Sequence, residues 1–346
     1  MAFTMHSHSG QFCPGHAKDQ LEAIVQHAIS LGYTTMGLTE HMPRIGLEDL
    51  YPEELDDPEA SLAALLPRHE AYLAEAQRLQ RAYAPRIHIL VGFEGEWLRP
   101  DAYAPLVASL AAHPAVDYFV GSLHHVAGVP IDYDGAHYAR AVAAAEAAAA
   151  AGQRAAPLAG SGDADADADA VDLPLPARGE EAAFARYYDE QYAMLRALRP
   201  RVVGHFDVVR LLSAAPGRDV RAAWPATVWP RVARNLRLVA RYGGWLECNT
   251  SALRKGLAEP YPARPVAEEW LRLGGRFTLS DDSHGRAHLG THYAPALDYL
   301  AALGVTALWT LRRDPHPGAP AGAPKAKLVE VEVPLESVRA VVSKWT

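Results

Sequence analysis

Seven short apolar runs along the chain each end in histidine or acidic side chains, the residue types that bind metal ions. The first run holds His6 and His8, and side chains two residues apart point to the same side of a strand. Two imidazoles can therefore grip one ion from an extended backbone. The other six segments are GLTEH (Glu40, His41), LVGFEGEW (Glu94, Glu96), FVGSLHH (His124, His125), VVGHFD (His205, Asp207), WLECNTS (Glu247, Asn249) and FTLSDDSH (Asp281, Asp282, His284).

The elements that position these groups alternate along the chain. Buried strands are predicted at 2–5, 35–39, 87–93, 118–123, 202–205, 245–249 and 277–280. Helices are predicted at 18–31, 68–83, 103–112, 139–151, 180–198, 229–242, 265–273 and 293–303. Seven strands alternating with helices indicate a parallel α/β fold. A barrel gathers the ends of all its strands at one rim, so we predict a single barrel domain over 1–346, with a metal site at the C-terminal ends of its strands.

Three stretches depart from this alternation. Residues 43–66 are acidic, proline-marked and weakly patterned, so we expect a long loop with one helical turn at most. Residues 152–178 hold a DADADADA repeat with little to bury, and we expect this insertion to be disordered. From 305 to 346, an APAGAP linker separates two strand-like runs, which predicts a terminal hairpin with a loose tip.

Bulk composition narrows the class of protein. The length of 346 residues suits one barrel-sized domain or two smaller ones, and the net charge of −8 disfavours a nucleic-acid partner. Two distant cysteines, Cys13 and Cys248, indicate a reducing compartment rather than a disulfide framework. We find no membrane-length apolar stretch and no room for a leader before His6, so we expect a cytoplasmic protein. Composition predicts no oligomeric state.

The candidate ligands are nitrogen and oxygen donors without thiolates, a set that suits Zn, Mn or Fe. They are too many for one ion, so we expect two or three divalent ions with a bridging carboxylate. Adjacent metals clamp phosphate-ester oxygens, lower the pKa of a bridging water and stabilise the leaving oxygen. Cationic side chains follow three of the segments and match phosphate well: Arg44, Arg210, Arg254 and Lys255. A small phosphate ester is therefore the expected substrate.

The segments HSHSGQFCPGHA, LTEHMPR, GFEGEW, GSLHHV, GHFDVVR, NTSALRKG and SDDSH together resemble the polymerase-and-histidinol-phosphatase (PHP) superfamily. Within it, they are most similar to the monofunctional histidinol-phosphatases, over roughly residues 3–290. The resemblance implies a distorted (β/α)7 barrel with two or three metal ions. It also implies hydrolysis of L-histidinol phosphate to L-histidinol and phosphate, in histidine biosynthesis. The insertion at 152–178 departs from the pattern but touches none of the matched positions.

The resemblance also implies roles for individual residues. The implied metal ligands are His6, His8, His16, His41, Glu94, His124, His205, Asp282 and His284, with His16 and His41 at the third metal and Glu94 bridging. The implied phosphate contacts are Arg210 and Arg254, with Ser251 nearby. Glu94, His124, Asp282, Arg210 and Arg254 would form the catalytic group. We add Arg44 as a further substrate contact and Asp132 as a contact for the substrate amine.

Several alternatives remain open. Glu96 shares a face with Glu94, and only the GxE pattern of the family favours Glu94, just as the DxH spacing favours Asp282 over Asp281. Another PHP-type phosphoesterase, acting on a nucleotide or on a different small ester, would use the same ligands. A metal-dependent amidohydrolase also begins with HxH, but it needs a bridging lysine where this chain has Glu94. A non-catalytic relic would have lost ligands, and none is missing. Five histidines away from strand ends are expected to lie at the surface or in helix packing: His27, His69, His88, His113 and His137.

Overall fold

The computed structural model describes residues 1–152, 173, 176, 178–314 and 326–345. The DADADADA repeat and the APAGAP linker lie outside the described residues, so the predictions made for them stay predictions.

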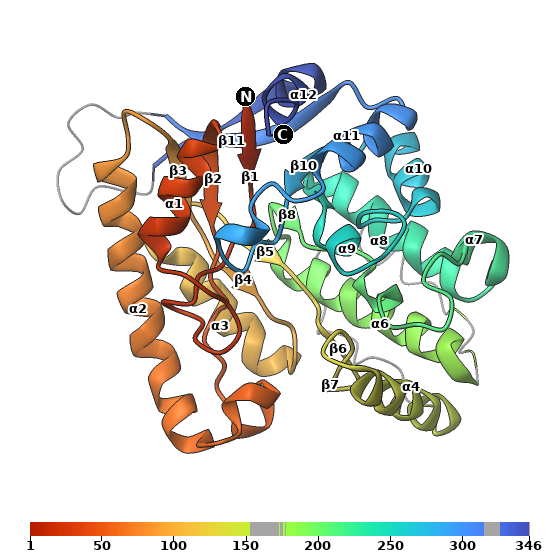
Figure 1. The fold of residues 1–346 in the computed structure, drawn as a ribbon. Coiled ribbons are helices and arrows are strands. Elements are labelled where there is room, and N and C mark those ends of the chain that lie inside the picture. The colour runs from red at the N-terminus through yellow and green to blue at the C-terminus, as the bar shows by residue number, and fades with distance from the viewer. Residues whose placement is uncertain (153–172, 174–175, 177, 315–325, 346) are drawn as a thin grey trace.

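The chain forms an α/β fold built on parallel strands (Figure 1). One sheet has the order β1-β2-β3, and a second has the order β10-β9-β8-β5-β4. The hairpins β11-β12 and β6-β7 are antiparallel. The strands are β1 (Ala2–Thr4), β2 (Tyr33–Leu38), β3 (His88–Val91), β4 (Glu94–Gly95), β5 (Val120–Gly121), β6 (His125–Val126), β7 (Val129–Pro130), β8 (Val202–Val203), β9 (Trp245–Asn249), β10 (Phe277–Ser280), β11 (Ala307–Arg313) and β12 (Leu328–Pro334).

Backbone hydrogen bonds join the two sheets at both junctions. Met5 N–H donates to Leu279 O at 3.1 Å beside β1 and β10, and Glu94 N–H donates to Glu40 O at 3.0 Å where β4 lies beside the end of β2. Strand pairing over the described residues nevertheless shows two parallel sheets rather than the predicted closed ring of seven strands. The reason is local: β4, β5 and β8 have only two residues each, because the chain leaves the regular ladder where the polar side chains begin.

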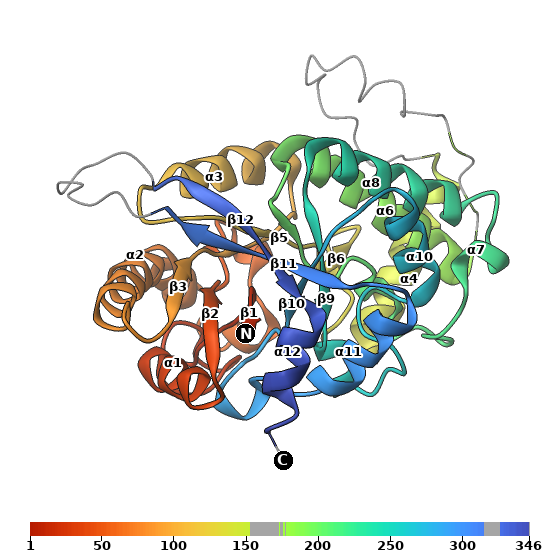
Figure 2. The same ribbon diagram turned by 90° about the horizontal axis from the view of Figure 1, so that it is seen from above.

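Helices surround the strands, as the view from above shows (Figure 2). Helix α8 shows why, because Val228, Val232, Leu236 and Val239 recur every three or four residues and are buried, while Gly243 ends the helix with φ 77°. The helices are α1 (Leu21–Ser30), α2 (Pro58–Ala82), α3 (Pro100–Ala112), α4 (Gly135–Ala150), α6 (Gly179–Leu198), α7 (Val220–Ala223), α8 (Val228–Tyr242), α9 (Ser251–Arg254), α10 (Arg264–Arg272), α11 (Tyr293–Ala302) and α12 (Leu335–Val342), with 3₁₀ turns η1 (Leu47–Asp49), η2 (Pro52–Glu54), η3 (Val208–Arg210) and η4 (Arg286–His288).

Helix α2 corrects the prediction of a long loop over 43–66. It begins at Pro58, ten positions before the predicted start at 68, and Pro67 lies inside it. Asp57 caps the helix by accepting a hydrogen bond from Ala60 N–H at 3.2 Å. Asp followed by Pro is a standard helix start, so the signal was present in the sequence and the internal proline obscured it.

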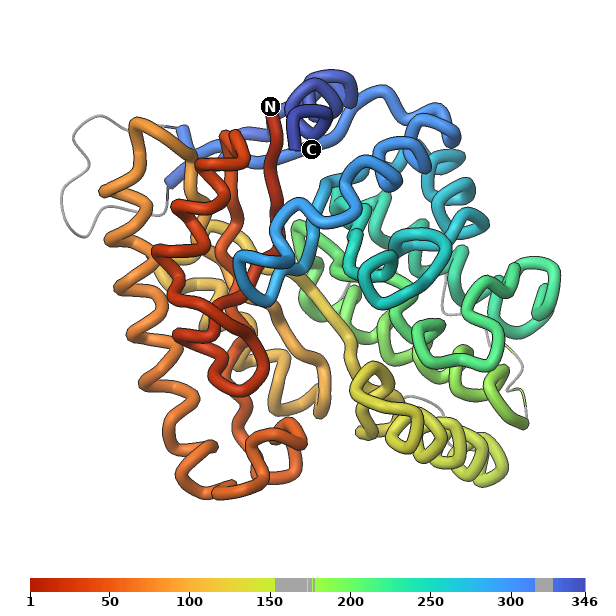
Figure 3. The backbone as a smooth tube through the Cα atoms, viewed as in Figure 1, coloured from red at the N-terminus to blue at the C-terminus, as the bar shows by residue number. Residues whose placement is uncertain are grey.

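The predicted terminal hairpin is present, and helix α12, which was not predicted, follows it. The hairpin crosses the amino ends of the parallel strands (Figure 2), where Arg313 N–H donates to His88 Nε2 at 3.1 Å. The first and last described parts of the chain meet at this end (Figure 3), since the Met1 ammonium donates to Ser337 O at 2.8 Å.

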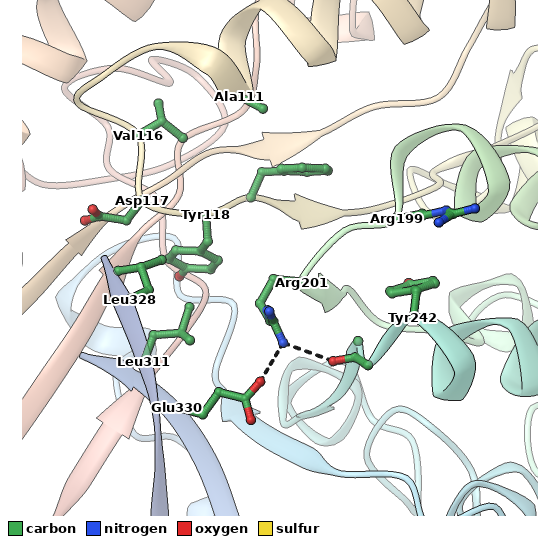
Figure 4. A pocket seen from close by; sticks show the side chains of 13 residues that line it. Ala111, Val116, Asp117, Tyr118, Arg199, Arg201, Tyr242, Leu311, Leu328 and Glu330 are labelled. Carbon is green, nitrogen blue, oxygen red and sulfur yellow. Dashed lines mark hydrogen bonds and ion pairs between the residues drawn. The ribbon is translucent and has the colours of Figure 1, made fainter. Parts of the chain in front are cut away.

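A hollow of about 310 Å³ lies between the hairpin and the ends of α6 and α8 (Figure 4). Arg201 points across it to Glu330, at 2.7 Å, and to the carbonyl of Gly243, at 3.0 Å. This end of the molecule is therefore closed by ion pairs and hairpin packing.

Among the described helices, none combines the length and the apolar character needed to cross a membrane.

Candidate metal centre

The side chains that follow the carboxyl ends of the parallel strands converge on one centre. They form three groups of three residues, and within each group the potential ligand atoms lie within 4.8 Å of one another. The groups are His8, His41 and His284; His6, His8 and Asp282; and Glu94, His124 and His205. Every ligand implied by the resemblance is in a group except His16. His16 lies beside them, with ring centres 4.8 Å from His284 and 5.2 Å from His41.

Glu94 stands between the groups. Its Oε2 lies 3.3 Å from His6 Nε2 and 3.5 Å from His8 Nε2. Its Oε1 lies 3.0 Å from His205 Nε2 and 3.4 Å from His124 Nε2. The two oxygens of one carboxylate therefore face different sets of imidazoles, which is the geometry that a bridging ligand requires. Glu94, at the start of β4, occupies the place where an amidohydrolase would need a lysine.

Two other carboxylates, those of Glu247 and Glu96, orient histidines of the centre by contacting one of their ring nitrogens. Glu247 on β9 contacts His6 Nδ1 at 2.8 Å, and Glu96 contacts His124 Nδ1 at 2.6 Å. A carboxylate on one ring nitrogen fixes the orientation of the ring and leaves the other nitrogen to a metal. Glu94 thus lies among the candidate ligand atoms, while Glu96 contacts His124 on its other ring nitrogen.

The charges of the centre are strongly coupled. Burial alone would raise the pKa of Glu94, but His6 and His124 hold that pKa well below its usual range. Burial also opposes the charge of Glu96, yet His124 lowers its pKa to about 2. In the opposite sense, burial would lower the pKa of His6, but Glu247 and Glu94 raise it well above normal. Glu94 and Glu96 are therefore charged at neutral pH, and this negative charge makes the centre suitable for a cation.

Several buried imidazole nitrogens at the centre have no hydrogen-bond partner among the described residues. These are Nε2 of His6, both nitrogens of His8, Nε2 of His41 and Nδ1 of His205. Leaving a buried polar atom unsatisfied costs about 1–3 kcal/mol, so such atoms cluster where a ligand completes them. The donor set, imidazoles and carboxylates without thiolate, fits a borderline divalent ion such as zinc.

The centre opens into a cavity of about 440 Å³. Its polar lining includes Asp132, Arg254 and Lys255, with Tyr51 and Glu53 on another side. Arg254 donates to the carbonyls of 281 and 282, each at 2.8 Å, and so holds the backbone at Asp282, whose φ is 47°. A left-handed aspartate is strained and needs such support.

Ser251 lies behind this wall, fully buried, and its hydroxyl donates to Asp282 Oδ2 at 3.1 Å. Lys255 is exposed, and among the described residues we find neither a hydrogen bond nor an ion pair for its side chain. The cavity therefore has two cationic residues beside the candidate ligands: Arg254, held by backbone carbonyls, and the exposed Lys255.

Two predicted substrate contacts lie apart from the cavity lining. Arg44 is buried and forms an ion pair with Glu54, with one contact at 2.6 Å. Arg210 is buried too; it donates to Asp207 Oδ2 at 3.0 Å and to the carbonyl of Pro260 at 2.7 Å. Neither residue is among the described residues that line the cavity. Both guanidinium groups have internal partners, and their contact with phosphate stays a prediction.

Tyr51 also belongs to this site, although its sequence context did not predict it. Its hydroxyl donates to Glu96 Oε1 at 2.8 Å and lies 3.4 Å from His41 Nδ1, while its ring lines the cavity. A tyrosine in an acidic, weakly patterned stretch carries no periodic signal, so nothing in the sequence singled it out.

Comparison with known proteins agrees with this geometry. The model of the PHP domain matches residues 4–251. A protein of Schizosaccharomyces pombe, named probable histidinol-phosphatase, is 36% identical over 91% of this chain and 91% of its own length. The histidinol-phosphatase of Saccharomyces cerevisiae is 30% identical over 85% of this chain and 87% of its own.

A solved structure of histidinol phosphate phosphatase from Lactococcus lactis, complexed with zinc, L-histidinol and phosphate, shares the fold. Its TM-score is 0.53 at 17% identity, covering 87% of this chain and 92% of that one. The extent of the domain match, together with the two relatives of similar length, shows that the chain belongs to the PHP family and, within it, to the histidinol-phosphatases.

Proposed function

We propose that this protein is a metal-dependent phosphomonoesterase that hydrolyses L-histidinol phosphate to L-histidinol and phosphate. The observation that carries the proposal is the arrangement of three potential ligand groups around Glu94, open to a cavity that also holds Arg254 and Lys255. The relatives named histidinol-phosphatases, and the Lactococcus structure with L-histidinol and phosphate, support this substrate. A place in histidine biosynthesis follows from that reaction.

We further propose that the two parallel sheets are parts of one distorted (β/α)7 barrel, and that residues 1–346 form a single domain. The backbone hydrogen bonds at Met5 and Glu94, which join the sheets at both junctions, support this. Closure puts all the strand ends at one rim, where the candidate ligands converge.

Two or three divalent ions would be held by His6, His8, His41, Glu94, His124, His205, Asp282 and His284, with His16 as an outer ligand of the third. Zinc is favoured by the donor set and by the zinc in the Lactococcus structure. Such ions supply a nucleophilic water at neutral pH and neutralise charge on the phosphate.

The chain's own residues bind and orient the substrate. Lys255 attracts the phosphate, and Arg254, which also lines the cavity, keeps the Asp282 turn in place. Asp132, a further lining residue, accepts a hydrogen bond from the substrate amine. The cavity of about 440 Å³ limits the ester to a compact molecule.

The test is phosphate release by purified, metal-analysed protein from L-histidinol phosphate, nucleoside monophosphates and sugar phosphates. Selective turnover of histidinol phosphate that chelator abolishes and added metal restores is expected. Turnover of another ester with none of histidinol phosphate would overturn the substrate while keeping the phosphatase. For Asp132, we compare Asp132→Ala on histidinol phosphate and on an aryl phosphate that has no amine. Only the first should lose activity, and equal losses would remove Asp132 as the amine contact.

A further inference from the structure

Residues 43–57, here called the strap, connect β2 to α2 and form one wall of the cavity through Tyr51, Pro52 and Glu53. Most of its large apolar side chains face solvent: Ile45 is 47% exposed, Leu47 45% and Leu55 52%. Leu50 is buried. Burial of apolar surface therefore contributes little to holding the strap in place.

Polar contacts hold it instead, and on the cavity side they end on candidate metal ligands or on a group that orients one. Tyr51 donates to Glu96 Oε1 at 2.8 Å, and the same oxygen contacts His124 Nδ1 at 2.6 Å. The Tyr51 hydroxyl also lies 3.4 Å from His41 Nδ1. The strap is thus connected to His41 directly and to His124 through one shared carboxylate oxygen.

A second contact lies two residues further along. Glu53 Oε1 is 2.6 Å from Nδ1 of His16, whose ring also stacks on Tyr51 with 5.6 Å between centres. The carboxylate on Nδ1 leaves Nε2 of His16 to face the neighbouring rings of His41 and His284. His16 is thus oriented by the strap in the same way as His6 is oriented by Glu247.

Arg44 and Glu54 make this connection rigid. The Arg44 guanidinium lies 3.8 Å from the centre of the Tyr51 ring and is paired with Glu54, which also accepts a hydrogen bond from Tyr51 N–H at 2.8 Å. At its other end the strap is fixed to α3, because Tyr103 donates to Asp49 Oδ2 at 2.8 Å. One part of the strap is therefore held by the hydrogen bond between Tyr103 and Asp49, and another part contacts the candidate metal centre.

We propose that Tyr51 and Glu53 are positioning residues that couple metal occupancy to the strap, so that the substrate-cavity wall is ordered by the loaded centre. A bound ion fixes the rings of His16, His41 and His124, and fixed rings present fixed partners to Tyr51, Glu53 and Glu96. The coupling is reciprocal, so an ordered strap also strengthens metal binding. This inference rests on the proposed metal centre, but not on the identity of the substrate.

Hydrogen exchange over residues 43–57 tests the coupling, in the full chain loaded with zinc and after chelator treatment. In the unsubstituted protein, zinc should slow exchange in the strap at least tenfold. The double variant Tyr51→Phe, Glu53→Gln should lose most of that difference and bind zinc more weakly in a chelator competition. Glu48→Gln, on the same strap but paired with Arg99 away from the cavity, is the matched control and should behave like the unsubstituted protein.

Two results would overturn the proposal: equal strap exchange with and without zinc, or a double variant that keeps the full zinc-dependent difference. Exchange in β9 monitors folding, and Tyr51→Phe alone provides a milder variant if the double one is unstable. Because no substrate is used, a protein that shows the coupling but does not hydrolyse histidinol phosphate would disprove the proposed function and leave this inference standing.

Discussion

The two ends of the parallel strands are built on opposite principles. At the carboxyl ends, several buried imidazole nitrogens have no hydrogen-bond partner in the part of the chain that the structure describes, and Asp282 is held in a left-handed conformation. At the amino ends, charges are paired: Glu330 lies 2.7 Å from Arg201 and 2.5 Å from Arg276. One end therefore keeps binding capacity at a cost in stability, and the other end supplies stability. The hollow of Figure 4 lies at the amino ends, and its arginine, Arg201, is already paired with Glu330.

The strongest challenge to this contrast is Glu94→Gln, which keeps the side-chain shape and removes the charge between the ligand groups. Phosphate release should fall by at least about 10³-fold, or about 4 kcal/mol of transition-state stabilisation, with loss of bound metal. The free energy of unfolding of the metal-free protein should fall as well, since the variant removes one partner of the buried charge interactions with His6 and His124. Glu332→Gln, an exposed position on β12, is the control. Activity within tenfold of the unsubstituted protein would contradict the central role of Glu94.

Glu247→Gln tests a group that acts only through a ligand. Glu247 contacts His6 Nδ1 at 2.8 Å and accepts a hydrogen bond from His205 N–H at 3.0 Å. Loss of such a partner typically lowers metal affinity about 10- to 100-fold. We expect reduced activity that excess zinc restores, with affinity measured by chelator competition. A loss that excess metal leaves unchanged would point to a structural defect instead.

Trp345→Ala probes the amino end. The centre of its indole ring lies 5.7 Å from the ring centre of Tyr33 and 5.6 Å from that of Tyr293. The indole Nε1 donates to Leu31 O at 2.7 Å. Truncation should reduce the free energy of unfolding by about 2 kcal/mol, somewhat less than for a fully buried tryptophan. Urea unfolding measures the loss, and Trp345→Phe should recover most of it. The value of kcat/KM should stay within about twofold, and a large fall would mean that the two ends are not independent.

The smallest effect concerns pH at the amino end. Burial, reinforced by Arg313 and Arg312, lowers the pKa of His88, whose Nε2 accepts a hydrogen bond from Arg313 N–H. The neutral form therefore stabilises the fold above the unfolded pKa of about 6.5, and this contribution is lost as pH falls through the lower folded value. It should be below about 1 kcal/mol, measured as the difference between the unsubstituted protein and His88→Gln in metal-free unfolding at pH 7.5 and 5.5. Identical pH slopes would contradict it.

The sequence predicted the α/β class and the residues that converge, because each ligand follows an apolar run and strand ends meet at one edge. His41, His205 and Asp282 could be identified in this way. It did not predict the partners of Arg44 and Arg210, since an arginine beside a ligand motif reads the same whether it faces substrate or a buried carboxylate. The partner of Arg44 is Glu54, in a stretch without periodic pattern, and that of Arg210 includes backbone carbonyls. Tyr51 was not predicted either, because it lies in the same stretch without periodic pattern as Glu54.

The positions of Glu94 and His8 determine how metal ions would bind to the candidate centre. Each ligand group shares atoms or a side chain with a neighbour: His8 belongs to two groups, and Glu94 directs one oxygen to each side. Successive ions at the proposed sites would not bind independently, because a first ion would orient a ligand that a second ion also needs. Stepwise affinities for metal ions would therefore describe the whole assembly, and no single dissociation constant would belong to one group alone.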